Sequence, residues 1–205
     1  MDWFYDKSTW ATTDTDWVFL GMSHPLDLVR WYLGPIAEVH AFAAGSALAT
    51  RYASGSPDVY AVGLRTADGR IGRAMGHYGL HELPSARNAI ELMLYGSEGT
   101  NQAQYHDMRF RYTAPDGSEV TEDSLYAMRR YYFNDEVHGM HYGEFANYLD
   151  TFAAALRTGQ HASPELEEGL EVLCVMEGAR RSASDGGRPV DLAPLYAEVG
   201  LDAVL

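Results

Sequence analysis

The clearest hydrophobic pattern in the chain lies in residues 23–34, which read Ser-His-Pro-Leu-Asp-Leu-Val-Arg-Trp-Tyr-Leu-Gly. Leu26, Val29 and Leu33 recur at helical spacing, and one side of Trp31 falls on the same face. The leading serine is a suitable N-cap, proline is tolerated in a first turn, and the final glycine can adopt the left-handed conformation that ends a helix. The segment therefore predicts an amphipathic helix that buries one face.

Shorter runs of alternating apolar and polar residues follow and predict strands. The strongest pair flanks Ala67-Asp68-Gly69, because Asp-Gly between two strand-like runs is the typical signal of a β-hairpin. Residues 45–57 are small and polar and predict a loop. The expected strands are 36–44, 60–66, 70–77, 89–95, 102–106 and 108–113.

Helical spacing returns in the last third of the chain and predicts two helices. Large apolar residues mark the first one, which should end at Gly159: Phe145, Tyr148, Leu149, Phe152 and Leu156. Ser163 as N-cap and a proline in the first turn predict the start of the second helix, and Asp185-Gly186-Gly187 predicts its end. The expected buried stripe of the second helix is Leu166, Leu170, Leu173 and Cys174.

Strands grouped apart from helices are typical of an α+β fold with a mainly antiparallel sheet, and not of a doubly wound parallel sheet. We expect residues 23–205 to form a single domain. Residues 1–22 show no regular period, yet they contain three of the four tryptophans. This N-terminal aromatic-rich segment is therefore expected to pack on the domain or on a neighbour.

The composition of the chain indicates which kinds of partner and which cellular compartment to expect. The formal net charge of -14 argues against nucleic acid or an anionic membrane as the main partner, because both require clustered lysine and arginine. The single cysteine, Cys174, excludes an internal disulfide and is expected to be a buried thiol. The N-terminus has no signal-peptide pattern, and no apolar run approaches the length of a membrane span. We expect a cytoplasmic protein.

The familiar nucleotide-binding and nucleophile motifs are absent from the 205 residues, which contain no G-x-G-x-x-G, P-loop, G-x-S-x-G or C-x-x-C pattern. Two histidine pairs have spacing that a zinc site could use: His77 with His81, next to Glu82, and His138 with His141. Neither pair falls on a predicted helix, so we expect hydrogen-bonding histidines and no metal.

His24 has two interpretations from its position alone. It could cap its helix or pack against the sheet, or it could act as a general acid or base near neutral pH. A catalytic imidazole usually has an orienting carboxylate, and Asp27 is expected to face Arg30 or the backbone instead. An aromatic and imidazole cluster that includes His138 and His141 is either a packed loop or a sugar-binding wall.

The order of several motifs resembles one protein family. Residues 21–34, followed by Glu-Val-His-Ala at 38–41, look like the start of the C-terminal domain of Gfo/Idh/MocA oxidoreductases, the relatives of glucose–fructose oxidoreductase and inositol dehydrogenase. Residues 96–100, 142–156 and 168–190 resemble later parts of that domain in the same order. The resemblance implies a large open antiparallel sheet with helices packed on one face.

The resemblance also implies a function, which is hydride transfer between NAD or NADP and a sugar, cyclitol or similar alcohol. His24 matches the family histidine near the reacting hydroxyl, and the expected substrate-binding residues are Lys7, Trp10, His138 and His141. The expected ligand is a small polar molecule such as a sugar or polyol, and the open sheet face is expected to form a homodimer or tetramer.

Two departures from the family pattern limit this expectation. The nucleotide-binding domain and its catalytic lysine are not in this sequence, so the chain alone is expected to bind no cofactor. Many members carry aspartate four residues before the histidine, where this chain has Leu20. The chain is thus expected to be the substrate-binding and oligomerisation domain of such an oxidoreductase. One alternative is a standalone non-redox lyase, isomerase or cyclase, or a binding subunit for a full-length relative. Another is a purely structural partner whose open sheet face pairs with another subunit.

Overall fold

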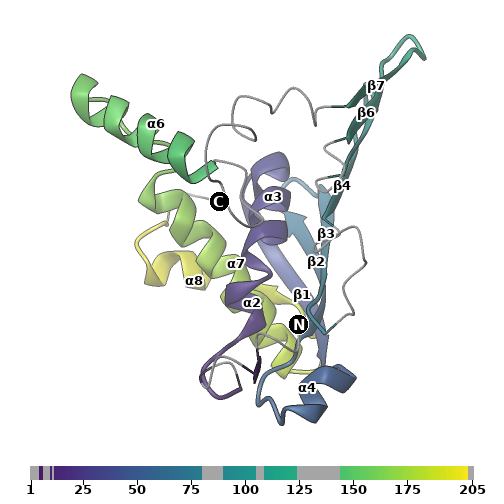
Figure 1. Ribbon diagram of the computed structural model, residues 1–205, viewed down its shortest axis with the longest axis vertical. Coiled ribbons are helices and arrows are strands. Elements are labelled where there is room, and N and C mark those ends of the chain that lie inside the picture. Colours follow the sequence, from purple (N-terminus) through teal and green to yellow (C-terminus); the bar gives the residue numbers. More distant parts are fainter. Residues whose placement is uncertain are drawn as a thin grey trace. The chain divides into compact units, whose positions relative to one another are not determined.

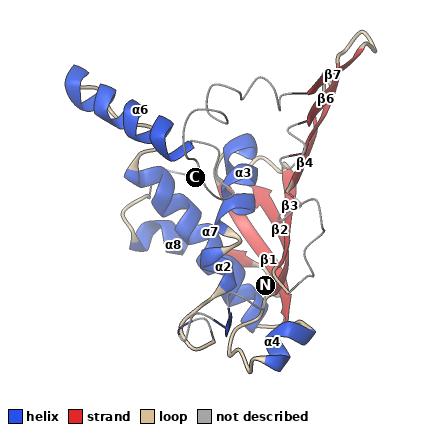
Figure 2. Ribbon diagram, in the orientation of Figure 1, coloured by secondary structure: helices blue, strands red, loops and turns tan. Residues whose placement is uncertain are grey.

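The structure is a computed structural model of the chain, and it describes residues 5–6, 10, 12–79, 90–104, 109–123 and 144–202. The chain divides into two compact units. Unit 1 comprises residues 1–81 and 164–205, and unit 2 comprises residues 82–163. Each unit combines α-helical structure with antiparallel strands (Figures 1 and 2), and the predicted α+β class is confirmed.

Unit 1 is a four-stranded antiparallel sheet with helices packed against it. The strand order is β3-β2-β1-β8, and α3 packs on β3 while α7 packs on β1. In Figure 1, α2, α3 and α7 lie on the same side of this sheet. The elements are α2 (Trp17–Leu20), α3 (Ser23–Leu33), β1 (Ile36–Ala44), α4 (Ala47–Arg51), β2 (Val59–Thr66), β3 (Ile71–His77), α7 (Leu166–Ser184), β8 (Val190–Asp191) and α8 (Ala193–Glu198).

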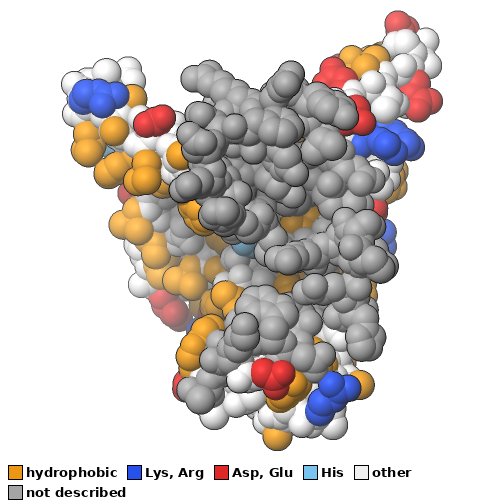
Figure 3. Space-filling view, viewed as in Figure 1, with side chains coloured by type: hydrophobic (Ala, Val, Ile, Leu, Met, Phe, Trp, Pro, Cys, Tyr) orange, Lys and Arg blue, Asp and Glu red, His pale blue; other side chains and the backbone are white. Residues whose placement is uncertain are grey.

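The described residues of unit 2 form a second sheet and a long helix. The strands β4 (Glu91–Tyr95), β5 (Thr100–Gln104), β6 (Arg109–Thr113) and β7 (Glu119–Asp123) pair antiparallel in chain order. The helix is α6 (Glu144–Thr158), and Gly159 follows it with a positive φ of 68°, as predicted for its end. Its apolar stripe is exposed (Figure 3), and the large side chains concerned are Phe145, Tyr148, Leu149, Phe152 and Leu156.

The predicted helix at 23–34 forms as α3, with a different cap and a narrower buried face. Ser23 is the first helical residue, and its hydroxyl donates a hydrogen bond to the Leu20 carbonyl over 3.0 Å, so it is not the N-cap. Leu26 is fully buried, but Trp31 is 65% exposed, contrary to the prediction. Gly34 ends the helix with a φ of 82°, as expected.

Helix α7 begins later than predicted, and the face that it buries differs from the face predicted from its leucines. Glu165 and not Ser163 is the N-cap, and its backbone N–H donates to Glu168 Oε2 over 2.8 Å. Leu166 and Leu173 are exposed, because the helix approaches the sheet through smaller residues. A Cβ at Gly178 would lie 2.5 Å from Leu192 Cδ2. The buried residues are Val172, Cys174, Val175, Met176, Gly178, Ala179 and Ser182.

Cys174 is buried, as predicted, and its thiol should be unreactive in the folded protein. Burial, together with the nearby charges of Glu198 and Glu171, raises the pKa of the thiol above its usual value. Because the thiolate is the reactive form, alkylation by iodoacetamide should be about tenfold or more slower in the native chain than in urea. Mass spectrometry of timed samples measures both rates, and equal rates would contradict the burial.

Helix α4 lies inside the segment 45–57 that was predicted as a loop. The Ser46 hydroxyl accepts hydrogen bonds from the backbone N–H groups of Leu48 and Ala49, so it caps this short helix. Asp58 is fully buried, and its carboxylate accepts hydrogen bonds from the backbone N–H and hydroxyl of Ser46, each over 2.6 Å. Buried polar groups need such partners, so this contact fixes the loop before β2.

The aromatic residues near the N-terminus pack on unit 1, which confirms that expectation for Tyr5 and Trp17. Both are buried, and Trp17 Nε1 donates to Tyr5 Oη over 3.0 Å. Trp17 stacks on Tyr78 with ring centroids 4.7 Å apart, and Tyr5 stacks on Tyr52 at 5.1 Å. Within the described residues, no helix is both long and apolar enough to cross a membrane.

Candidate functional site

The candidate site is the start of α3, where His24 is the second helical residue and is exposed. The first N–H groups of a helix lack an intrahelical acceptor, and they create a region of positive potential there. Among the described residues the His24 imidazole makes no hydrogen bond and no ion pair. Its exposure argues against the interpretation of a packed histidine and leaves the ring accessible to a ligand.

Tyr78 lies beside this site and was not identified from the sequence. It follows β3 and stacks on Trp17 of α2. A Cβ added at Gly21, three residues before His24, would lie 2.6 Å from Tyr78 Oη, so the phenol packs against the turn between α2 and α3. Burial raises the pKa of Tyr78, and the neutral hydroxyl can donate a hydrogen bond throughout the physiological pH range.

Arg30 fixes α3 against α7. Its guanidinium donates from Nε and Nη2 to Asp27 Oδ1 over 3.1 and 3.0 Å, and from Nη1 to Glu171 Oε2 over 3.1 Å. The predicted pairing of Asp27 with Arg30 is thereby confirmed. Burial alone would lower the pKa of Arg30, but the hydrogen bonds and charges of Asp27 and Glu171 raise it. This network positions the helix that carries His24.

Leu20 is the position where the family resemblance led us to expect an aspartate. It is the last residue of α2, and it is exposed one helical turn before His24. A leucine side chain cannot accept a hydrogen bond from the imidazole, so no orienting carboxylate comes from this position.

The other residues predicted for the site are only partly described. Trp10 is half exposed, and its carbonyl accepts a hydrogen bond from the Asp14 backbone N–H over 2.8 Å, so it leads into the loop before α2. Lys7, His138 and His141 lie outside the described residues, as do His81 and Glu82. His77 ends β3, and its Nδ1 is buried without a hydrogen-bond partner in the described part of the chain.

The described residues do not fit a nicotinamide dinucleotide or a metal. Dinucleotides bind at the carboxyl ends of parallel strands, beside a glycine-rich turn and a helix N-terminus. Every pair of described strands is antiparallel, and the sequence contains no such turn. No group of three or more His, Cys, Asp or Glu side chains within the described residues could hold a metal ion.

Comparison with known proteins now identifies the class to which this α+β unit belongs. Residues 11–192 match the Gfo/Idh/MocA family domain described as "Oxidoreductase family, C-terminal alpha/beta domain". The match covers most of the chain, so the chain belongs to this family, and the resemblance noted in the sequence is confirmed. No curated protein matches the chain.

Solved structures with the same fold are full-length oxidoreductases. An oxidoreductase from Agrobacterium radiobacter in complex with NAD+, L-tartaric acid and magnesium is 21% identical with a TM-score of 0.68, and the match covers 85% of this chain and 48% of that one. Levoglucosan dehydrogenase in complex with NADH and levoglucosan is 19% identical with a TM-score of 0.66. This match covers 83% of this chain and 48% of the dehydrogenase.

An aldose-aldose oxidoreductase from Caulobacter crescentus complexed with glycerol is 18% identical with a TM-score of 0.61, and the match covers 82% of this chain and 45% of that one. At these identities the likeness establishes the fold alone. This chain spans about half the length of the structures that it matches. The matched region of each structure has the fold of the family's C-terminal domain.

Proposed function

We propose that this chain is the substrate-binding and oligomerisation domain of an NAD- or NADP-dependent oxidoreductase that acts on a sugar, cyclitol or similar polyol. The observation that carries the proposal is the family match over residues 11–192, together with an exposed His24 at the start of α3. The dinucleotide would bind to a nucleotide-binding domain elsewhere, because the described residues do not fit it. This chain alone would then catalyse no redox reaction.

Within this proposal His24 is the group that exchanges a proton with the reacting hydroxyl of the substrate. An exposed imidazole at a helix start is suited to this task because one of its ring nitrogens can accept a proton while the other donates one. Tyr78 would donate a hydrogen bond to a second substrate oxygen beside the same turn. Lys7, Trp10, His138 and His141 remain proposed contacts to the substrate.

A second candidate is a non-redox enzyme or a binding subunit descended from this domain. The observation that favours it is Leu20, which removes the carboxylate that commonly accompanies the family histidine. An NAD+-reduction assay separates the two candidates. The chain joined to the nucleotide-binding domain of a full-length relative should oxidise at least one sugar or polyol, while the chain alone should not. Failure of every joined assembly to reduce NAD+ or NADP+ would favour the second candidate.

The open face of the sheet in unit 1 is the surface we propose for oligomerisation with a second copy. Helices α3 and α7 pack on the opposite face. Phe42, Ala61 and Met75 form one cross-strand row on the open face, and the side chains of Phe42 and Met75 are exposed. Ile71 lies on the same face of β3 and is also exposed. Exposed apolar residues gathered on a flat sheet are typical of a protein interface.

Met75→Glu should therefore weaken self-association. A charge at the centre of an apolar interface is desolvated without a partner, so the dimer dissociation constant should rise about tenfold or more. Sedimentation equilibrium measures this change. Leu166→Glu, an equally exposed apolar residue on α7, is the matched control and should leave association unchanged. A monomeric wild-type chain, or equal effects of both variants, would contradict the proposed interface.

A further inference from the structure

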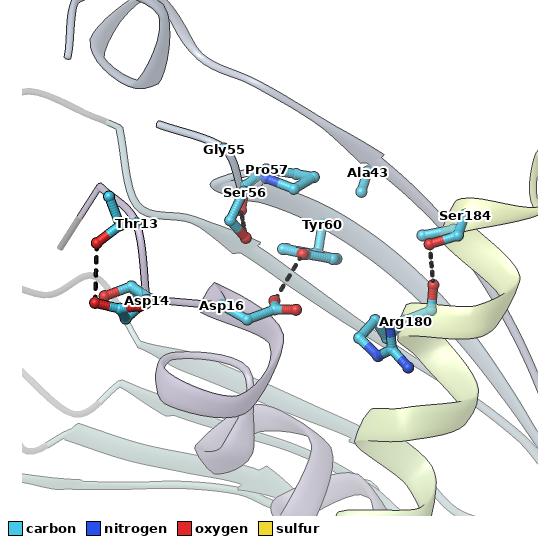
Figure 4. Close-up of a pocket in the computed structure, with 12 residues that line it drawn as sticks. Thr13, Asp14, Asp16, Ala43, Gly55, Ser56, Pro57, Tyr60, Arg180 and Ser184 are labelled. Atoms are coloured by element: carbon cyan, nitrogen blue, oxygen red, sulfur yellow. Dashed lines mark hydrogen bonds between the residues drawn. The ribbon is translucent and has the colours of Figure 1, made fainter. Parts of the chain in front are cut away.

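A cavity of about 480 Å³ lies within unit 1, apart from α3 and His24. The loop before α2, the loop before β2 and the C-terminal end of α7 contribute to it, together with Ala43 of β1 and Tyr60 of β2 (Figure 4). Its volume lies within the range of roughly 300–1,000 Å³ that is typical of small-molecule sites. The lining residues that carry the argument are Asp14, Thr15, Asp16, Ser56, Tyr60 and Arg180.

The wall of the cavity is held in place by hydrogen bonds. Tyr60 is buried, and its hydroxyl donates to Asp16 Oδ1 over 3.2 Å, while the same oxygen accepts from the Val18 backbone N–H over 3.1 Å. Burial raises the pKa of Tyr60, as does the charge of Asp16. The second oxygen of Asp16 accepts no hydrogen bond from the described residues. It can accept a hydrogen bond from a ligand.

Arg180 supplies donors to the same cavity. Its Nε and Nη2 donate to Glu177 over 2.7 Å each, which fixes the guanidinium plane and leaves Nη1 without a partner in the described part of the chain. Figure 4 shows Arg180 on α7 facing the side of the cavity that holds Asp16 and Tyr60. The cavity thus offers acceptors on one side and a donor on the other.

Thr15 provides an independent sign that the cavity receives a polar molecule. It lines the cavity and is only 8% exposed, yet its hydroxyl has no hydrogen-bond partner within the described residues. Buried polar groups in proteins are nearly always satisfied, by protein, water or a ligand. Ala43, Pro57 and Ala183 add an apolar wall against which C–H groups can pack.

We infer that this cavity binds an uncharged polyol or monosaccharide. Vicinal hydroxyls can donate to Asp14 and Asp16 and accept from Arg180 at once. The two carboxylates would repel an anion, and the positive charge of Arg180 would repel an ammonium compound. The inference does not rest on the function proposed for the His24 site, because the two sites share no residue.

Titration calorimetry with the 205-residue chain tests the inference, with myo-inositol and D-glucose as probes and D-glucuronate and D-glucosamine as charged counterparts. We expect millimolar binding of at least one uncharged probe, and weaker binding of its charged counterparts. Asp14→Asn and Arg180→Gln should each weaken the binding of the uncharged probe about tenfold, because each variant loses one charge-assisted hydrogen bond. Arg181→Gln, which breaks the other contact to Glu177, and Asp185→Asn are the matched controls and should change affinity less than about twofold.

His24→Ala separates this site from the proposed substrate site. It should leave binding at the cavity unchanged. Absence of binding by every uncharged probe would overturn the inference, as would equal losses in the control variants or equally tight binding of a charged probe. Loss of binding only in His24→Ala would also overturn it, and would place the ligand at the start of α3 in support of the proposed function.

Discussion

Arg30→Met is expected to destabilise unit 1 by about 3–5 kcal/mol. The guanidinium is buried and pairs with Asp27 and Glu171, and Glu171 is itself mostly buried. Removing one partner of a buried ion pair leaves the remaining carboxylates close together without a counter-charge. Urea unfolding followed by tryptophan fluorescence measures the effect. All four tryptophans fall within residues 1–81, so the signal reports on unit 1.

Two further variants show whether burial of the charges is the cause. Arg180→Met removes an even shorter pair, with Glu177 at 2.7 Å, but Arg180 is half exposed, so the loss should stay below about 1 kcal/mol. Adding Glu171→Leu to Arg30→Met should recover part of the lost stability, because it removes the buried charge left behind. Equal losses from the two arginine variants would contradict this explanation of how α3 is positioned.

His24→Ala is expected to have the largest effect on activity. In the chain joined to a nucleotide-binding domain, kcat should fall about 10²–10⁴-fold, because loss of a general acid or base slows proton transfer by this factor. The free energy of unfolding should change by less than about 0.5 kcal/mol, since the ring is exposed and makes no hydrogen bond within the described residues. Steady-state kinetics and urea unfolding of the same preparation measure the two quantities.

The control for this prediction is His161→Ala, a second exposed histidine outside the proposed site. It should leave kcat unchanged. Leu20→Asp extends the test, because it places a carboxylate one helical turn before His24 and should raise kcat if the imidazole lacks an orienting partner. An unchanged kcat in His24→Ala would remove this residue from the proposed mechanism.

The parts of the fold that follow from local sequence signals were predictable. The capped segment 23–34 became α3, and the Asp-Gly turn at 68–69 joined β2 to β3 in the expected hairpin. The face that a helix buries was less predictable. In α7 the leucines at 166 and 173 are exposed, because small residues such as Ala179 and Ser182 pack closest to the sheet.

Ser182 shows why such packing escapes a search for large apolar residues. It is fully buried, its oxygen accepts a hydrogen bond from the Ala41 backbone N–H over 2.8 Å, and its hydroxyl donates to the Arg188 carbonyl over 2.6 Å. Ala41 is remote in sequence and Arg188 lies after the turn that ends α7, so no local pattern indicates these contacts.

The candidate site was predictable only at His24, whose helix-start position and family resemblance are local features. Tyr78 reaches the turn at Gly21 because it stacks on Trp17 of α2, which is a tertiary contact. Arg180, on α7, is likewise remote in sequence from Asp14 and Asp16, and folding alone places these three residues around one cavity. Residue types indicate what each side chain can do, but the topology decides which of them meet.

The central claim is that this domain binds substrate and depends on another domain for its dinucleotide. Calorimetric titration of NADH and NADPH into the 205-residue chain tests it most directly. The predicted result is no measurable binding by the chain alone, and micromolar binding once the chain is joined to a nucleotide-binding domain of the family. Micromolar binding of either dinucleotide by the chain alone would contradict the claim.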